Sequence, residues 1–125
     1  MKTLLQFGAG KIGRSFIAQI FSRAGYRIIF VDIDPCVVKA INEKETYTVI
    51  ITGNDGRKEE YDVGNISAIE ISSTRKVIRA IQDADIISVS VGKKSLLTLA
   101  RIFARGIKNR YQERKDAPVD IILAE

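Results

Sequence analysis

Short apolar runs alternate along this chain with longer stretches whose apolar residues recur at helical spacing. The short runs predict buried strands, at residues 4–7, 27–31, 68–71, 85–91 and 119–124. The helical spacing predicts helices between them, at residues 11–24, 35–44, 74–82 and 95–109. This alternation predicts an α/β fold, a doubly wound and mostly parallel sheet covered by helices.

Residues 46–63 depart from that alternation. Residues 46–52 are rich in β-branched and aromatic side chains, residues 54–56 (Asn-Asp-Gly) are a turn signal, and residues 58–63 are again extended. We therefore predict a β-hairpin inserted in the doubly wound pattern.

The helix ends carry signals of their own. Gly25 is expected to stop the first helix, Ser72 and Ser73 to cap the third, and a polar stretch at 110–118 to lead into the last strand. The first helix has an apolar stripe that we expect to face the sheet: Ile12, Phe16, Ile17, Ile20, Phe21 and Ala24.

A glycine-rich turn follows the first predicted strand directly. Gly8, Gly10 and Gly13 have the spacing G-x-G-x-x-G, which allows a tight turn, close approach of the backbone to a diphosphate, and close packing of the next helix. The free N–H groups at the start of that helix would face the phosphates. We therefore predict a Rossmann-type dinucleotide-binding domain over residues 1–125, whose diphosphate site includes the glycines and their neighbours Phe7, Ala9, Lys11 and Ile12.

The second predicted strand ends at Asp32, close to the interval of about 20 residues at which such folds place a ribose-binding acid. A carboxylate there would accept hydrogen bonds from the adenosine ribose and repel a 2′-phosphate. No arginine follows at once, so NAD is favoured over NADP, with Ile33 beside the adenine. Asp34 competes for this role, but it precedes Pro35 and is interpreted as a helix N-cap. A solvated acid at the strand end is the alternative for Asp32.

The strand at 85–91 places its carboxyl end at the same crevice. Val91 and Gly92 are expected to line the path of the nicotinamide half of the cofactor. Lys93 and Lys94 are interpreted as solvated loop charges. Arg14, in the first turn of the first helix, either reaches a phosphate or lies at the surface.

Composition excludes several kinds of chemistry. The 125 residues suffice for one domain, and they include one cysteine and no histidine. An intrachain disulfide and a histidine-dependent nucleophile are therefore excluded, and a metal site is not expected. Cys36, at a predicted helix start, is interpreted as structural or incidental rather than catalytic, because the chain has no histidine to partner it.

The formal charge of +5 reflects basic residues that concentrate late in the chain. We interpret these residues as a solvated surface rather than a nucleic-acid site: Arg101, Arg105, Lys108, Arg110, Arg114 and Lys115. No apolar run is long enough to cross a membrane and the N-terminus lacks a signal-peptide pattern, so we expect a cytoplasmic protein, and a monomer.

The motif from Phe7 to Arg14, Phe-Gly-Ala-Gly-Lys-Ile-Gly-Arg, resembles the Phe-Gly-Ala-Gly-Asn-Ile-Gly-Arg of the polyol-specific long-chain (mannitol) dehydrogenase family. The resemblance extends over essentially the whole chain. Phe30-Val31-Asp32 is similar to the family's second strand. Three further stretches resemble landmarks of the family: residues 42–47, 91–92 and 121–125.

This resemblance implies NAD-dependent interconversion of mannitol 1-phosphate and fructose 6-phosphate, with a catalytic lysine, asparagine and histidine in a second, mostly helical domain. The last predicted strand reaches Glu125 without the loop or helix that normally follows a strand. We therefore expect a truncated N-terminal domain, inactive alone, whose sugar-alcohol phosphate site lies outside this chain. The alternatives are another polyol or hexuronate reductase of the same family, and a non-catalytic nucleotide sensor of the Rossmann type.

Overall fold

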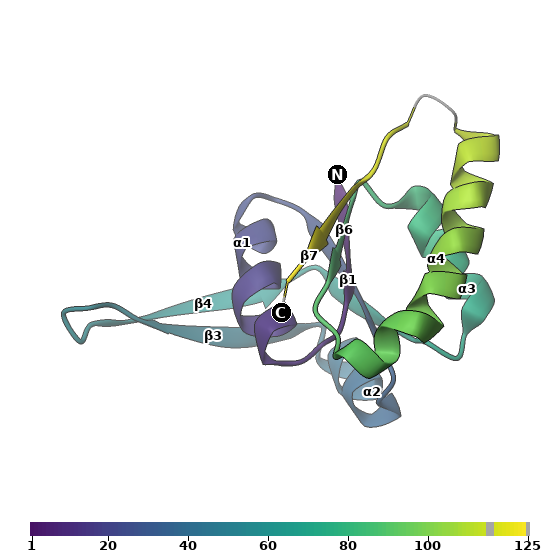
Figure 1. The fold of residues 1–125 in the computed structure, drawn as a ribbon. Helices are drawn as coiled ribbons and strands as arrows, with labels where there is room; N and C mark the ends of the chain where they lie inside the picture. Colours follow the sequence, from purple (N-terminus) through teal and green to yellow (C-terminus); the bar gives the residue numbers. More distant parts are fainter. Residues whose placement is uncertain (115–116, 125) are drawn as a thin grey trace.

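A computed structural model describes residues 1–114 and 117–124. Its main body is a five-stranded sheet with the order β5-β2-β1-β6-β7, in which every pair is parallel, flanked by helices (Figure 1). The strands of this sheet are β1 (Thr3–Phe7), β2 (Arg27–Asp32), β5 (Ile66–Glu70), β6 (Ile86–Val89) and β7 (Asp120–Leu123). The predicted doubly wound α/β fold is confirmed.

The strand order places a switch of direction at the centre of the sheet. The chain moves outward from β1 to β2 and β5, and then returns to the other side of β1 with β6 and β7. Phe7, at the end of β1, is level with Val31 of β2 and Val89 of β6. The carboxyl ends of these strands therefore meet at one edge, where ligands bind in open α/β sheets.

Helices cover the two faces of the sheet and bury two clusters of apolar side chains. One face carries a helical turn with π-type hydrogen bonding, η1 (Ile12–Ile17), which continues as α1 (Ala18–Arg23), and also α2 (Pro35–Lys44). The other carries α3 (Thr74–Asp83) and α4 (Lys93–Glu113). Alternate residues of β1 divide between the clusters, with Leu4 on the first face and Leu5 on the second, as expected of a strand covered on both sides.

The predicted apolar stripe of the first helix is only partly right. Ile17 and Ala18 are buried, but Ile12, Phe16 and Ile20 are 40%, 57% and 45% exposed. The N–H of Ala18 bonds to the carbonyl of Gly13, five residues back. This wider turn changes the phase of the residues relative to a regular α-helix, so the sequence spacing misplaces the buried face.

The inserted hairpin is confirmed as β3 (Thr46–Thr52) and β4 (Lys58–Gly64), an antiparallel pair that projects from the body (Figure 1). Its base rests on α1. The guanidinium of Arg23 lies 4.5 Å from the centre of the Tyr61 ring, and Val49 and Val63 are buried in the first cluster.

An asparagine covers the outer edge of β5. The Nδ2 of Asn42, on α2, donates to the carbonyl of Ala68 at 3.0 Å, and the N–H of Ala68 donates to Oδ1 of Asn42 at 2.8 Å. The amide side chain therefore takes the place of a neighbouring strand at this residue. No hydrogen bond of this kind shields the other edge within the described residues, where β7 pairs only with β6.

Several predicted boundaries shift. Helix α4 extends beyond 95–109 in both directions, so Lys93 and Lys94 begin it and the first part of the polar stretch is helical. Strand β6 ends at Val89, two residues before the predicted end, and the next residue, Ser90, lines the cavity described below. Ser73 precedes α3, but its side chain makes no capping hydrogen bond. Residues 115–116 and Glu125 lie outside the described residues.

The prediction of solvated basic residues is wrong at one of the five positions that the structure describes, and the sixth, Lys115, lies outside the described residues. Arg101, Arg105 and Lys108 are exposed, as expected, but Arg110 is only 4% exposed. Its guanidinium turns inward because backbone carbonyls surround it, which no local sequence signal indicates.

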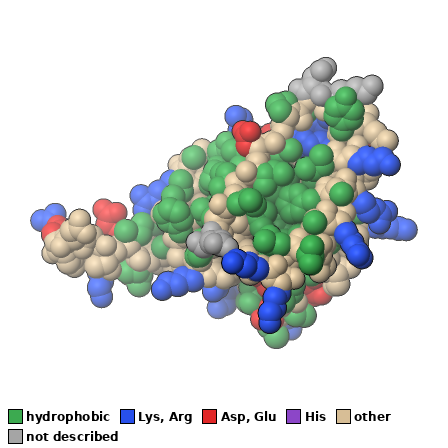
Figure 2. Space-filling view, in the orientation of Figure 1, with side chains coloured by type: hydrophobic (Ala, Val, Ile, Leu, Met, Phe, Trp, Pro, Cys, Tyr) green, Lys and Arg blue, Asp and Glu red, His purple; other side chains and the backbone are tan. Residues whose placement is uncertain are grey.

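Hydrophobic side chains gather on the face between α4 and β7 (Figure 2). They line a hollow of about 450 Å³ that includes Leu96, Phe103 and Leu123. No helix in the described part of the chain has both the length and the hydropathy needed to cross a membrane.

Candidate functional site

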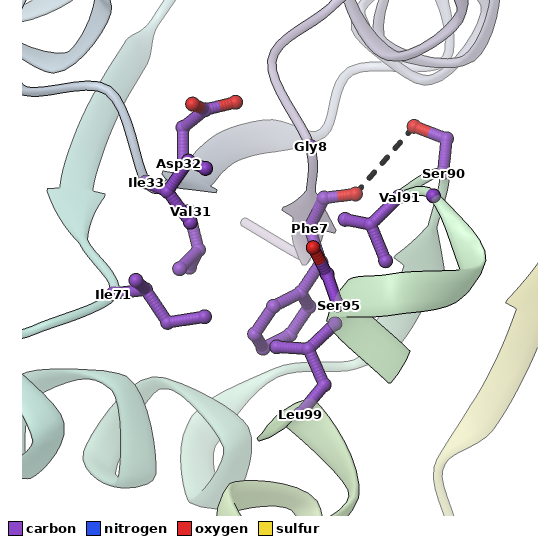
Figure 3. A pocket seen from close by; sticks show the side chains of 11 residues that line it. Phe7, Gly8, Val31, Asp32, Ile33, Ile71, Ser90, Val91, Ser95 and Leu99 are labelled. Atoms are coloured by element: carbon purple, nitrogen blue, oxygen red, sulfur yellow. Dashed lines mark hydrogen bonds between the residues drawn. The ribbon is translucent and has the colours of Figure 1, made fainter. Parts of the chain in front are cut away.

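A cavity of about 260 Å³ opens at the carboxyl ends of β1, β2 and β6 (Figure 3). Six residues that the sequence assigns to a cofactor site line it: Phe7, Gly8, Asp32, Ile33, Val91 and Gly92. Five more line it that the sequence analysis missed: Val31, Ile71, Ser90, Ser95 and Leu99. Ile71 and Ser90 directly follow β5 and β6, but the sequence places both inside predicted strands, so it does not indicate that they border a cavity. Whether Ser95 and Leu99 face the cavity depends on the residue at which α4 begins, which the sequence places two residues too late.

Gly8 is required where it stands. Its φ of +98° is a conformation that residues with a side chain rarely adopt, and a Cβ there would lie 2.6 Å from the carbonyl oxygen of Ser90. Its N–H donates to the carbonyl of Val31 at 2.8 Å, which ties the turn to β2. The glycine therefore brings the turn against both neighbouring strand ends.

The other two glycines of the motif differ in their surroundings. A Cβ on Gly13 would overlap the carbonyl oxygen of Gly8, so the helix packs directly on the turn. A Cβ on Gly10 would meet nothing within 4 Å. Gly13 thus serves internal packing, whereas Gly10 borders open space, as a residue beside a ligand would.

Asp32 holds the glycine turn. Its Oδ2 accepts the N–H of Ala9 at 2.7 Å, and its Oδ1 accepts the N–H of Asp34 at 2.9 Å. Each carboxylate oxygen can accept a further hydrogen bond. Asp34 is confirmed as the N-cap of α2, because its Oδ1 accepts the N–H of Cys36 at 2.9 Å.

The backbone donors that follow the turn are open. Among residues 1–114 and 117–124, none accepts a hydrogen bond from the N–H of Gly10, Lys11 or Ile12. These groups lie at the start of η1, where unpaired N–H groups and the helix dipole favour an anion. The turn therefore has the chemistry of a phosphate site built from main chain.

Arg14 does not line this cavity. It lines a separate hollow of about 290 Å³ between η1, α2 and the hairpin, together with Cys36 and Lys44. Its carbonyl accepts the hydroxyl of Tyr47 at 2.7 Å. Burial raises the pKa of Tyr47 above its ordinary value, against the opposing effect of the Arg14 charge.

One buried polar residue beneath the turn was also missed. Gln6, in the middle of β1, is fully buried, and its Nε2 donates to the carbonyl of Gly8 at 3.2 Å. A glutamine inside an apolar strand is unusual and could have drawn attention. No group of three potential metal ligands occurs in the described part of the chain.

Comparison with known proteins supports this assignment of the fold. Residues 2–125 match the family model described as the mannitol dehydrogenase Rossmann domain. A solved oxidoreductase of the short-chain dehydrogenase/reductase family from Burkholderia thailandensis, 15% identical, superposes with a TM-score of 0.55 over 96% of this chain and 50% of its own. That likeness is one of fold alone.

Two curated relatives are mannitol-1-phosphate 5-dehydrogenases. The protein from Enterococcus faecalis is 33% identical over 122 residues, which cover 97% of this chain and 31% of the relative. The protein from Streptococcus mutans is 36% identical over 126 residues, which cover 100% of this chain and 32% of the relative. The chain thus spans about a third of the length of these relatives.

Proposed function

Because the chain belongs to the mannitol dehydrogenase family, as a Rossmann domain, we propose that it binds NAD in the cavity at the carboxyl ends of β1, β2 and β6. The curated relatives are dehydrogenases, and a Rossmann domain of such an enzyme implies a nicotinamide cofactor. One observation carries the proposal. The Gly8–Ala9 peptide is fixed by Asp32, while the next three N–H groups have no acceptor in the described part of the chain.

In this proposal the main chain binds the diphosphate. The N–H groups of Gly10, Lys11 and Ile12 donate to phosphate oxygens, and Gly10 lets the phosphates approach because it has no side chain. Gly8 and Gly13 shape the turn, because a Cβ at either position would lie too close to backbone atoms. Lys11 needs no specific side chain for this role.

The adenosine half lies toward β2. Asp32 accepts hydrogen bonds from the ribose hydroxyls through the acceptor capacity that its two backbone contacts leave free. Ile33, 70% exposed at the rim, packs on the adenine. A 2′-phosphate would approach the Asp32 carboxylate and be repelled, so NAD is preferred over NADP. Val91 and Gly92 line the path toward the nicotinamide.

We propose further that the complete enzyme oxidises a sugar-alcohol phosphate, with mannitol 1-phosphate and fructose 6-phosphate as its substrate pair. Bound NAD would supply the hydride acceptor. The group that handles the proton, and the site for the phosphorylated polyol, would lie outside these 125 residues, so this chain alone is expected to be inactive. The names of the curated relatives support this substrate class.

The partner of the complete enzyme is then a small molecule, and the chain is expected to be a monomer that does not bind nucleic acid. The exposed Arg101, Arg105 and Lys108 support a solvated helix face. Sedimentation of the chain with and without an oligonucleotide checks both statements.

Calorimetric titration tests cofactor binding. We expect weak binding of NAD, saturating at millimolar cofactor, a smaller response to NADP, and no NAD reduction when mannitol 1-phosphate is added. A folded chain that releases no heat with millimolar NAD would contradict the proposal. Equal responses to NAD and NADP would contradict the role of Asp32.

A further inference from the structure

Gln6 is a buried polar side chain whose hydrogen bonds all lead toward the cavity. It is fully buried in the central strand. The two hydrogens of its Nε2 are shared among the carbonyl of Phe7 at 3.0 Å, the carbonyl of Gly8 at 3.2 Å and Oγ of Ser90 at 2.8 Å, whereas its Oε1 has no partner among the described residues. Burying an amide is costly unless it is hydrogen-bonded, and an apolar residue would fill the space without that cost. The three contacts suggest a role at the strand end.

The first role concerns the orientation of one peptide. The carbonyl of Gly8 accepts from Gln6, and the N–H of the same peptide, from Ala9, donates to Asp32 at 2.7 Å. A trans peptide is planar, with its C=O and N–H on opposite sides. Holding both groups therefore fixes the rotation of the plane, which in turn sets the direction of the N–H groups that follow it.

The second role concerns the two walls of the cavity. Gly8 lies on one wall and Ser90 begins the loop of the other. The Gln6–Ser90 hydrogen bond joins them beneath the floor, and the N–H of Ser90 donates to the carbonyl of Phe7 at 2.9 Å. Figure 3 shows the longer contact from Ser90 Oγ to the same carbonyl, at 3.5 Å.

We propose that Gln6, acting through Ser90 and the Gly8–Ala9 peptide, is a positioning residue for the diphosphate of the dinucleotide. It touches no ligand atom. Its amide holds the turn in the one orientation that presents the open N–H groups to the phosphates. This inference rests on the proposed function, and it adds a residue that sets affinity for one part of the cofactor.

The test compares ligands with and without a diphosphate. In Gln6→Met, which keeps the volume and removes the donor, ADP-ribose should bind about tenfold more weakly, while adenosine, followed by NMR titration, should change less than about twofold. A purely structural defect would weaken both ligands alike. Equal loss for both, or no loss for ADP-ribose, would overturn the inference.

Ser90→Ala provides a milder variant in case Gln6→Met fails to fold, and it should weaken ADP-ribose selectively by roughly threefold. Ser88→Ala is the control, because Ser88 lies two residues before the half-buried Ser90, is itself buried in β6, and has an Oγ with no partner among the described residues. It should leave both affinities unchanged. If Ser88→Ala weakened ADP-ribose binding selectively and as much as Ser90→Ala does, that result would count against the inference.

A double-mutant cycle completes the test. If Gln6 and Ser90 act together, the double variant should bind ADP-ribose only slightly more weakly than Gln6→Met alone. Additive losses would show that the two side chains act independently. Failure of the unmodified chain to bind either ligand would instead refute the proposed function, which keeps the two outcomes apart.

Discussion

The carboxyl ends of the parallel strands form one edge of the sheet, the carboxyl edge, and their amino ends form the opposite one, the amino edge. Backbone groups at these two edges are satisfied in different ways. At the carboxyl edge, Asp32 accepts the N–H of Ala9 and the donors that follow remain open. At the amino edge, Asp85 accepts the N–H of Thr3 at 2.8 Å, and Arg110 donates to carbonyls at the end of α3 and before β7. An acidic side chain therefore binds backbone at the start of β1 and in the turn that follows it, and at the turn three neighbouring N–H groups have no acceptor among the described residues.

Arg110 accounts for most of this difference. Its Nη1 donates to the carbonyls of Ile81, Gln82 and Ala84 at the end of α3, at 3.2, 2.8 and 2.6 Å. Its Nε and Nη2 donate to the carbonyls of Ala117 and Pro118, both at 3.1 Å, which lead into β7. A cation at a helix C-terminus is also favoured by the helix dipole. Changes at the amino edge should therefore alter stability, and changes at the carboxyl edge should alter affinity.

The largest effect is expected from Arg110→Met. Several buried carbonyls would lose their donor at once, so the free energy of unfolding should fall by roughly 3 to 5 kcal/mol. Urea denaturation measures this, with the exposed Arg105→Met as the control, expected to change stability by less than about 0.5 kcal/mol. Equal stability of the two variants would remove the distinction between the edges.

Gly13→Ala should lower both the stability and the NAD affinity, because the added Cβ would overlap the Gly8 carbonyl oxygen and displace the turn. We expect a loss of about 1 to 3 kcal/mol in unfolding free energy, together with weaker NAD binding. Gly10→Ala, whose Cβ meets only open space, should keep its stability and lose affinity alone. Thermal melting and calorimetry on both variants give the comparison. A stable Gly13→Ala would argue that the turn is less tightly packed than described.

Asp32→Ala should weaken NAD by roughly 1 to 3 kcal/mol, because it removes a charged acceptor from the ribose and a clamp from the turn. Asp34→Ala is the neighbouring control. It should cost about 1 kcal/mol of stability through loss of the helix cap and leave NAD affinity unchanged. If Asp34→Ala weakened NAD binding and Asp32→Ala did not, the ribose-binding residue would be Asp34.

The smallest effect is expected from Tyr47→Phe, which loses the hydrogen bond to the Arg14 carbonyl and should cost about 1 kcal/mol. Because burial raises the pKa of Tyr47 in the folded state, its stabilising contribution is complete below the ordinary pKa of 10.0 and is lost as pH rises above it. The variant should therefore lose less stability between neutral and alkaline pH. Tyr111→Phe, at a ring 66% exposed, should behave as wild type. If Tyr47→Phe loses as much stability at alkaline pH as the unmodified chain does, then groups other than Tyr47 cause that loss.

Much of the fold could be predicted because its signals are local. Apolar runs indicated the five parallel strands, Asn-Asp-Gly indicated the hairpin, and Asp34 before Pro35 marked the start of α2. The glycine spacing and Asp32 likewise lie within one strand-helix-strand unit, so this half of the candidate site could be proposed from local sequence signals.

What could not be predicted depends on contacts between distant segments. Arg110 meets carbonyls that only the packing of α3 against α4 brings near it, and Gln6 meets Ser90 because β1 and β6 are neighbours in the sheet. The exposure of Phe16 depends on the π-type turn, which the spacing of apolar residues does not reveal.

The amide of Asn42 has a consequence for the direction in which the sheet can grow. By occupying both backbone groups of Ala68, it blocks an incoming strand at β5, as edge-protecting devices do in proteins that avoid intermolecular β-pairing. Across the described residues the opposite border, at β7, carries no such guard, and Leu123 there is 76% exposed. An added strand would therefore meet a barrier at β5 and none of this kind at β7, so a charged side chain in place of Leu123 is the change expected to oppose pairing there.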